Sequence, residues 1–245
     1  MNESGLTAAR YVSHLTRLGQ LPKASLPKRL VVVFGPAPKV WRGRAQAVAF
    51  GSLRISPDGG VGVLGTSLAG APSAAVLMSC LGELGVERIL VVGRAGLAIS
   101  QHGDEPTAVD INVLSSADGD DSTSLAYGRR GSVESSAQQT GDLLRELVRS
   151  GCEAELSRTW STDVPFLVDG DRLESVLAAD GVVEMEATTL FTLAERYDIK
   201  IAQCVVVSDV RRGTEWRPLD TKIVADLMNR AVVACVSVLE QGTGV

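Results

Sequence analysis

The chain has 245 residues, of which 45% are hydrophobic and 22% are charged, and its formal net charge is −5. This composition is ordinary for a soluble globular protein, and the acidic balance argues against general nucleic-acid binding. No apolar run approaches the roughly 18 residues that predict a transmembrane helix, so we expect no membrane partner. The N-terminal segment lacks the apolar core of a secretory signal, and the 4 cysteines are scattered as in reduced, structural thiols. We therefore expect a cytoplasmic protein.

Short apolar runs rich in β-branched residues alternate with amphipathic helical patterns along the chain. Such runs suit strands buried on both faces, and they predict strands at 30–35, 60–65, 88–93, 108–114 and 201–209. Apolar residues at helical spacing, with glycine stops at two ends, predict helices at 72–85, 135–151, 187–198 and 220–241. The alternation indicates an α/β fold with a largely parallel or mixed central sheet.

Two further segments are polar or weakly patterned. Residues 1–28 form a leader with a weak helical signal, and residues 115–132 are rich in glycine, serine and aspartate. The second is typical of a loop, either mobile or placed over a site. Neither reads as an interdomain linker, so we expect a single domain over residues 1–245.

Glycines and basic residues follow two of the predicted strands. In open α/β sheets, ligands bind beyond the carboxyl ends of the strands. Gly35 and Lys39 follow the strand at 30–35, and Gly93, Arg94 and Gly96 follow the strand at 88–93. Glycine-rich turns leave backbone N–H groups for an anion, so the pattern indicates a phosphate-like site. Two tight turns with solvated basic side chains explain it equally well.

Acidic residues in apolar surroundings are the second candidate feature. Glu184 and Glu186 lie in "VVEMEATTLF", where burial of a carboxylate is costly unless it is paired. In an extended segment both would point to one face, where a carboxylate can accept hydrogen bonds from a sugar diol. Asp209 follows Ser208 at the end of an apolar strand and could act as a general acid. The alternative for Asp209 is a helix N-cap.

The stretch "VEMEATTLFTLAERYDIKIAQCVVVSD", residues 183–209, resembles the nucleoside phosphorylase-I family. This family comprises the purine nucleoside and uridine phosphorylases and the methylthioadenosine/S-adenosylhomocysteine nucleosidases. Segments 31–40, 70–97 and 117–128 are similar to its phosphate loop, its G-x-P-S to G-x-x-G stretch and its D-G-T-S-x-x-Y region. The resemblance covers most of residues 14–240.

The resemblance implies both a fold and a reaction. The fold would have three αβα layers with a mixed, partly barrel-like central sheet. The reaction would be cleavage of the N-glycosidic bond of a purine-type nucleoside, with phosphate as co-substrate and no cofactor or metal. Such a reaction passes through an oxocarbenium-like sugar and needs leaving-group protonation, ribose anchoring and a placed nucleophile.

On the sugar and base side, the resemblance assigns a role to each acid. Glu186 would bind the ribose 2′- and 3′-hydroxyls, and Met185 would pack under the sugar. Glu184 would be a neighbouring, partly structural acid. Asp209 would donate a proton toward the purine N7, with Ser208 beside it.

Three more residues match less specific positions of the family. Phe166 could stack on the base, and a place in the core is equally compatible with it. His14 falls near a histidine that reaches across a dimer to the sugar 5′-hydroxyl, although a surface histidine on a leader helix is the alternative. Arg44 falls near an arginine that a neighbouring subunit lends to the phosphate. We therefore expect a homodimer or hexamer with the leader at the dimer interface.

On the phosphate side, the chain departs from the family pattern. Gly35 would give its backbone N–H to phosphate, and Lys39 replaces an arginine, although lysine cannot grip phosphate in bidentate fashion. Val91 stands where phosphorylases have a phosphate-binding arginine, and Arg94 stands where serine or threonine follows. The first loop also lacks the glutamate with which the nucleosidases activate water.

A supporting arginine for the acidic proton donor has no clear counterpart either, and Lys222 or Arg212 could substitute for it. Three functions therefore stay open. The chain is a phosphorylase, or a nucleosidase or other glycosyl-transfer enzyme with a remodelled phosphate site, or a non-catalytic nucleoside-binding member of the family.

Overall fold

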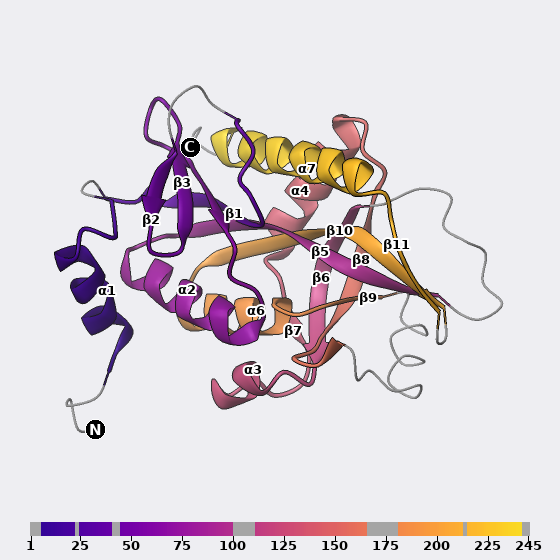
Figure 1. Cartoon of the computed structure of the whole chain (residues 1–245), viewed down its shortest axis with the longest axis horizontal. Coiled ribbons are helices and arrows are strands. Elements are labelled where there is room, and N and C mark those ends of the chain that lie inside the picture. Colours follow the sequence, from indigo (N-terminus) through magenta and orange to yellow (C-terminus); the bar gives the residue numbers. More distant parts are fainter. Residues whose placement is uncertain are drawn as a thin grey trace.

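The computed structural model describes residues 6–22, 25–40, 45–99, 111–165, 181–212 and 215–241, and Figure 1 shows how its elements are arranged. Its strands are β1 (Arg29–Phe34), β2 (Gln46–Val48), β3 (Gly51–Ile55), β4 (Gly62–Thr66), β5 (Arg88–Ile99), β6 (Ile111–Gly119), β7 (Val133–Glu134), β8 (Ala154–Ser161), β9 (Val182–Glu184), β10 (Lys200–Arg212) and β11 (Glu215–Pro218). Its helices are α1 (Ala8–Arg17), α2 (Ala71–Glu83), α3 (Ser122–Ala126), α4 (Ala137–Arg149), α6 (Ala187–Arg196) and α7 (Thr221–Gln241).

Within the described residues the strands form one mixed sheet of 11 strands, and part of this sheet closes into a barrel. β5 and β10 pair in parallel over nearly their whole length. β10 also pairs with β6, β6 with β8, β8 with β9, and β9 with β5, so the ring returns to its start. The predicted α/β fold with a mixed, partly barrel-like sheet is confirmed.

Helices cover both faces of the sheet, which gives the molecule three layers (Figure 1). Leu30 and Val32 of β1 face the core that α2 and α6 cover. Their neighbours Val31 and Val33 face the core that α4 and α7 cover. Because successive side chains of a strand point to opposite faces, burial of both faces requires an unbroken apolar run. For this reason, the unbroken apolar runs in the sequence predicted the central strands.

The prediction of a glycine turn at residues 93–96 is wrong, because β5 continues through these residues to Ile99. The neighbouring strand supplies the reason. Val206 of β10 pairs with Arg94, and Asp209 pairs with Gly96. The ladder thus satisfies the backbone groups that a turn would have left for an anion.

The polar segment predicted as a loop at 115–132 is partly regular. β6 runs on to Gly119, and α3 covers Ser122–Ala126. Asp121 caps α3 by accepting a hydrogen bond from the Ser124 backbone N–H at 2.7 Å. This short helix brings a polar cluster against the start of α6.

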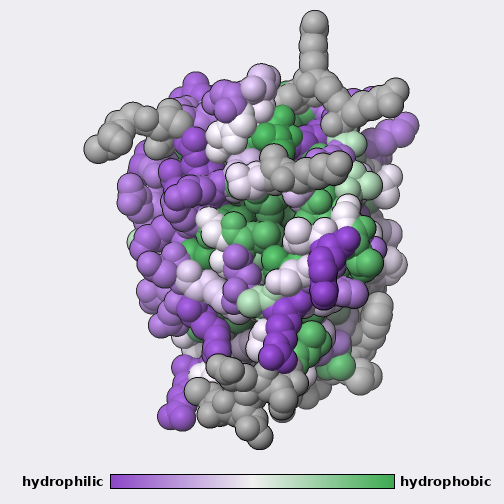
Figure 2. All heavy atoms as spheres, turned by 90° about the vertical axis from the view of Figure 1, so that its left-hand side faces the viewer, coloured by the Kyte–Doolittle hydropathy of each residue, from purple (hydrophilic) through white to green (hydrophobic). Residues whose placement is uncertain are grey.

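The described part of the predicted leader contains α1, which lies at one edge of the molecule. Tyr11, Val12 and Leu15 of α1 contact the core that α2 and α6 cover. Figure 2 shows the face on this side, where hydrophobic side chains gather near the centre among hydrophilic ones. None of the described helices has the length and apolar character needed to cross a membrane.

Candidate functional site

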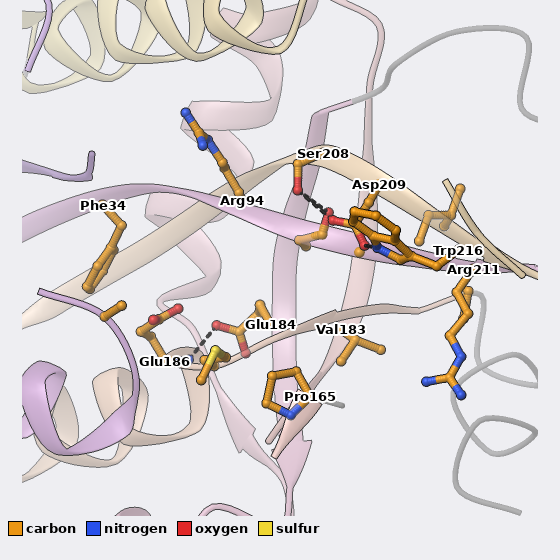
Figure 3. Close-up of a pocket in the computed structure, with 16 residues that line it drawn as sticks. Phe34, Arg94, Pro165, Val183, Glu184, Glu186, Ser208, Asp209, Arg211 and Trp216 are labelled. Atoms are coloured by element: carbon orange, nitrogen blue, oxygen red, sulfur yellow. Dashed lines mark hydrogen bonds between the residues drawn. The ribbon is translucent and has the colours of Figure 1, made fainter. Parts of the chain in front are cut away.

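A cavity of about 760 Å³ opens where β5, β9 and β10 meet beside the edge strand β11 (Figure 3). Most of its wall is apolar, and a few polar side chains converge on it. Its lining consists of Phe34, Ala69, Arg94–Ala98, Pro165, Val183–Glu186, Ser208, Asp209, Arg211 and Trp216. A largely apolar hollow with a few convergent polar groups is the usual form of a small-molecule site.

The cavity brings together predicted residues from distant parts of the chain. Glu184, Met185 and Glu186 reach it from the end of β9, and Ser208 and Asp209 reach it from β10. Figure 3 shows Glu186 and Asp209 toward opposite ends of the cavity, with Glu184 between them. The cavity therefore has Glu184 and Glu186 toward one end and Asp209 toward the other, and most of the remaining lining is apolar.

Glu184 is buried and forms the structural centre of the first end, with only 4% of its surface exposed. Its Oε2 accepts hydrogen bonds from the backbone N–H groups of Glu186 and Ala187, both at 2.8 Å. Its Oε1 accepts a short hydrogen bond from the Ser161 hydroxyl and a longer one, at 3.5 Å, from Thr159. Glu184 thus satisfies donors at the start of α6 that have no partner within the helix.

The charge of Glu184 is nevertheless costly at this position. Burial, together with repulsion by Glu186, raises the pKa of Glu184 to about 7. The hydrogen bonds donated by Ser161 and by the Glu186 and Ala187 amides oppose this rise. The carboxyl group is therefore a titrating element of the fold near neutral pH.

Glu186 is held from the opposite direction, by the start of α2. Its Oε1 accepts a hydrogen bond from the Gly70 backbone N–H at 2.6 Å. Gly70 has a φ of 81°, in the left-handed region that glycine adopts without steric cost, which aims this N–H at Glu186. Burial raises the pKa of Glu186, against the amides of Gly70 and Met185. Figure 3 shows its carboxylate turned toward the cavity.

A buried polar network, which the sequence reasoning did not detect, supports this end from behind. The Asp121 carboxylate accepts hydrogen bonds from the hydroxyls of Ser124, Thr188 and Thr189. Burial tends to raise the pKa of Asp121, but these bonds outweigh it and hold the pKa below its ordinary value. Ser161 accepts from the Thr188 N–H at 3.1 Å, which joins the network to Glu184. The threonine pair in "EATTLF" was the available signal.

The second end of the cavity is built around Asp209. A bulge in the pairing of β10 with β5 falls between Val207 and Asp209, at Ser208. The Ser208 hydroxyl donates to Asp209 Oδ1 at 2.8 Å. On β5, Gly96 lies so close that a Cβ there would come within 2.9 Å of Asp209 Oδ2. The absent side chain is what lets the carboxylate occupy this place.

The hydrogen-bond partner of Asp209 Oδ2 is Trp216, which the sequence reasoning did not name. The indole N–H of Trp216 donates to Oδ2 at 3.0 Å. Lys222, one of the two predicted supports, lies at the start of α7 outside the cavity lining. The side chain of Arg212, the other, lies outside the described residues. The mostly hydrophilic run of residues 210–218, which contains Trp216 as its one aromatic residue, was the available signal.

Of the described residues predicted to bind phosphate, only Arg94 lines the cavity. Arg94 is exposed and lines the cavity. Lys39 is exposed and does not line it. The Gly35 N–H donates to the carbonyls of Val33 and Thr66, at 2.9 and 2.8 Å, so it is already engaged within the loop. This geometry gives no support to an anion contact through Gly35.

Of the remaining predicted residues, only His14 lies among the described residues. His14 is exposed on α1 and does not line the cavity of its own chain. Arg44 and Phe166 lie outside the described residues. Among the described residues no group of three or more histidine, cysteine or acidic side chains could hold a metal ion.

Comparison with known proteins identifies the family. The family model of the phosphorylase superfamily matches residues 34–241. The chain belongs to this superfamily. A crystal structure of purine nucleoside phosphorylase from Toxoplasma gondii, in complex with immucillin-H, is similar in fold, with a TM-score of 0.73 and 16% sequence identity. The match covers 90% of this chain and 95% of that one. No curated protein sequence matches the chain.

As a member of the phosphorylase superfamily, the chain has a cavity whose two sides differ in completeness. Glu184 and Glu186 are fixed by buried hydrogen bonds from several elements. Val91, which the resemblance predicted to replace a phosphate-binding arginine, is fully buried in the core that α2 and α6 cover. Arg94 is the only predicted cation among the described lining residues.

Proposed function

We propose that this protein cleaves the N-glycosidic bond of a purine-type nucleoside with phosphate, giving the free base and a sugar 1-phosphate. The observation that carries the proposal is one apolar cavity lined by Glu186 near one end and by the Ser208–Asp209 pair near the other. Two carboxylates in separate environments can take separate roles, one as a hydrogen-bond acceptor and one as a proton donor. The superfamily match and the similar purine nucleoside phosphorylase support this assignment.

At the sugar end, Glu186 binds the 2′- and 3′-hydroxyls of the ribose. Gly70 holds one carboxylate oxygen, so the group is oriented before the sugar arrives. Met185 lines the same wall and offers an apolar surface to the sugar ring. Glu184 acts indirectly, since it accepts hydrogen bonds from the backbone N–H groups of Glu186 and of the next residue, Ala187.

At the base end, Asp209 supplies the proton that the leaving base needs. Breaking the glycosidic bond leaves an electron pair on the base, and protonation of a ring nitrogen stabilises the departing group. Ser208 donates to Asp209 and sits within proton-transfer distance of it. The apolar wall between the two ends excludes water from the sugar as positive charge develops there.

Phosphate attacks the sugar carbon in this scheme and is held by Arg94, with Lys39 at the rim. Arg44 and His14 come from a second copy of the chain in a homodimer or hexamer. The exposed position of His14 on α1, away from its own cavity, supports this arrangement. So does the hydrophobic centre of the face that carries α1, because exposed apolar patches mark association surfaces (Figure 2).

Hydrolysis, with water in place of phosphate, is the second candidate. The buried Val91 and the engaged Gly35 amide favour it, because both remove anion ligands that the family pattern provides. Arg94 would then occupy or border the pocket that phosphate fills in the phosphorylases. The two candidates share the sugar and base ends and differ only in the nucleophile.

A nucleoside panel with and without phosphate separates the candidates. Base release that requires phosphate and yields sugar 1-phosphate is expected. Equal base release in both conditions contradicts phosphorolysis and favours hydrolysis. Ligands that stabilise the protein in a thermal-shift assay without any base release would point to the non-catalytic alternative. A monomer in gel filtration contradicts the roles of His14 and Arg44.

A further inference from the structure

Trp216 is an exposed aromatic residue at the rim of the cavity, with one polar anchor. It lies on β11, an edge strand of the described sheet, and 65% of its surface is exposed. Its ring lines the cavity and its indole N–H donates to Asp209 Oδ2 at 3.0 Å. Figure 3 shows the indole beside Asp209, at the end of the cavity opposite Glu186.

The hairpin of β10 and β11 fixes this contact through the backbone. Trp216 is paired with Arg211, and Asp209 is paired with Pro218. Trp216 and Asp209 are therefore diagonal neighbours on one face of an antiparallel ladder, within reach of a long side chain. Gly96 on the opposite side leaves room for the carboxylate. Asp209 is thus confined between two strands.

The two side chains that donate to Asp209, Trp216 and Ser208, differ in whether they can also accept a hydrogen bond. An indole N–H can only donate, whereas a serine hydroxyl can both donate and accept. Oδ2 is consequently fixed as an acceptor as long as Trp216 stays in place. A proton carried by Asp209 resides on Oδ1, which lies 2.8 Å from the Ser208 hydroxyl.

The indole is a neutral donor, so its contact with Asp209 is a directional hydrogen bond and not an ion pair. Arg211 is the nearest basic side chain along β10, and Figure 3 shows its guanidinium directed away from Asp209. Trp216 orients the carboxyl group without placing a positive charge on it.

We propose that Trp216 is the positioning residue for proton delivery to the base, and that its ring forms the outer wall of the base end. This inference rests on the proposed function. Trp216 holds Oδ2, and the proton on Oδ1 passes to a ring nitrogen of the base beside Ser208. The glycosidic C–N bond breaks, its electron pair stays on the base, and the sugar carbon bonds to the nucleophile's oxygen. Asp209 is left as a carboxylate and regains a proton from solvent.

Trp216→Phe tests the inference, because it keeps an aromatic wall and removes only the N–H. Its effect is measured on two substrates: an ordinary nucleoside, and a riboside with a nitrophenolate leaving group that departs without protonation. The kcat for the nucleoside should fall about 10-fold to 100-fold, the range for losing a hydrogen bond to a charged group, with little change in KM. The kcat for the nitrophenyl riboside should change less than threefold.

Trp160→Phe is the matched control. Trp160 lies on β8 outside the cavity lining, and its indole N–H has no hydrogen-bond partner among the described residues. This variant should leave both reactions unchanged. Equal losses on both substrates in Trp216→Phe would mean a general structural role and overturn the inference, as would no loss on either.

A second measurement separates this inference from the proposed function. In a ¹H–¹⁵N spectrum, the indole signal that disappears in Trp216→Phe should shift in Asp209→Asn and stay in place in Trp160→Phe. A signal that does not move in Asp209→Asn overturns the positioning contact even when the enzyme is active. If the signal shifts in Asp209→Asn but the wild-type protein releases no base, the contact between Trp216 and Asp209 is supported. The proposed function is then contradicted instead.

Discussion

The sugar end and the anion end of the cavity are built in opposite ways. Glu184 and Glu186 are held by hydrogen bonds from β8, α2 and the start of α6, and one of them is almost completely buried. Arg94 and Lys39 are exposed, and the Gly35 amide is engaged elsewhere. The first end is held by buried contacts within the chain and is costly to disturb. The described cations of the second end are exposed side chains.

This difference indicates which end of the cavity tolerates substitution of its residues and which does not. A buried acid with several partners cannot be replaced without leaving donors unsatisfied, so the sugar end is constrained by stability as well as by binding. An exposed cation can be exchanged at little cost to folding. Substitutions at the exposed end should therefore disturb the fold less than substitutions at Glu184 and Glu186.

Replacing Glu186 with alanine is expected to have the largest effect on turnover. Two hydrogen bonds between a carboxylate and sugar hydroxyls are lost, so kcat/KM should fall by about 100-fold to 10,000-fold. Steady-state kinetics on the best nucleoside measures it. Glu195→Gln, at an exposed acid on α6, the helix that follows Glu186, is the control and should be unchanged. Retention of activity in Glu186→Ala would remove Glu186 from the sugar site.

Replacing Glu184 with alanine should mainly destabilise the fold. Two backbone donors at the start of α6 and the Ser161 hydroxyl lose their acceptor, which should cost about 2 to 3 kcal/mol in the free energy of unfolding. Urea denaturation measures the change. Glu155→Ala, an exposed residue of β8, should stay within about 0.5 kcal/mol of the wild type. A Glu184→Ala protein of normal stability would show that the buried network is not needed to hold this end.

The raised pKa of Glu184 also predicts how the stability of the protein depends on pH. Because the pKa of Glu184 is raised to about 7 in the folded state, the folded protein binds more protons than the unfolded chain between the ordinary glutamate pKa and that value. The contribution of this group is therefore greatest at low pH and is lost as pH rises toward neutrality. The raised pKa of Glu186 acts in the same direction.

Unfolding free energies measured between about pH 5 and pH 7.5 should thus fall with rising pH. Glu184→Gln carries no titrating group at this site, so it should show a distinctly flatter curve. The lowered pKa of Asp121 affects stability only at more acidic pH, below the ordinary aspartate pKa, and does not interfere. A wild-type stability that rises across this interval would contradict the raised pKa of the pair.

The sequence predicted the parts of the fold that depend on local pattern. The buried strands β1, β4, β5, β6 and β10 were recognisable because both of their faces are covered, and Glu184, Glu186 and Asp209 stood out as acids in apolar runs. The reach of β5 through Gly93 and Gly96 was missed, because β10 decides it through pairing. Propensity at a glycine-rich stretch cannot reveal a partner strand more than a hundred residues away.

The partners of the site residues were missed for a related reason. Trp216 reaches Asp209 only through the register of an antiparallel hairpin. Asp121 meets Thr188, which lies 67 residues further along the chain. Gly70 meets Glu186 where α2 and α6 pack against each other. These contacts are products of tertiary structure, and the sequence shows the residue types without the pairing.

The smallest effects are expected at the anion end, and they decide which nucleophile the protein uses. Arg94 lines the cavity whereas Lys39 does not, so the two cations should respond differently. Arg94→Ala should raise the KM for phosphate about 10-fold, in line with the loss of a charge-assisted hydrogen bond. Lys39→Ala should raise it about twofold, because Lys39 lies outside the lining and its exposed charge is screened by solvent.

The matched measurement is base release at rising phosphate concentration in both variants and in the wild type. If Arg94→Ala keeps the wild-type dependence on phosphate, Arg94 is not a phosphate ligand in this chain. If that variant instead gains phosphate-independent base release, its guanidinium had been filling the pocket of the nucleophile. In the latter case the two ends of the cavity would differ in chemistry as well as in construction, with the sugar held as in the phosphorylases and water reaching it in place of phosphate.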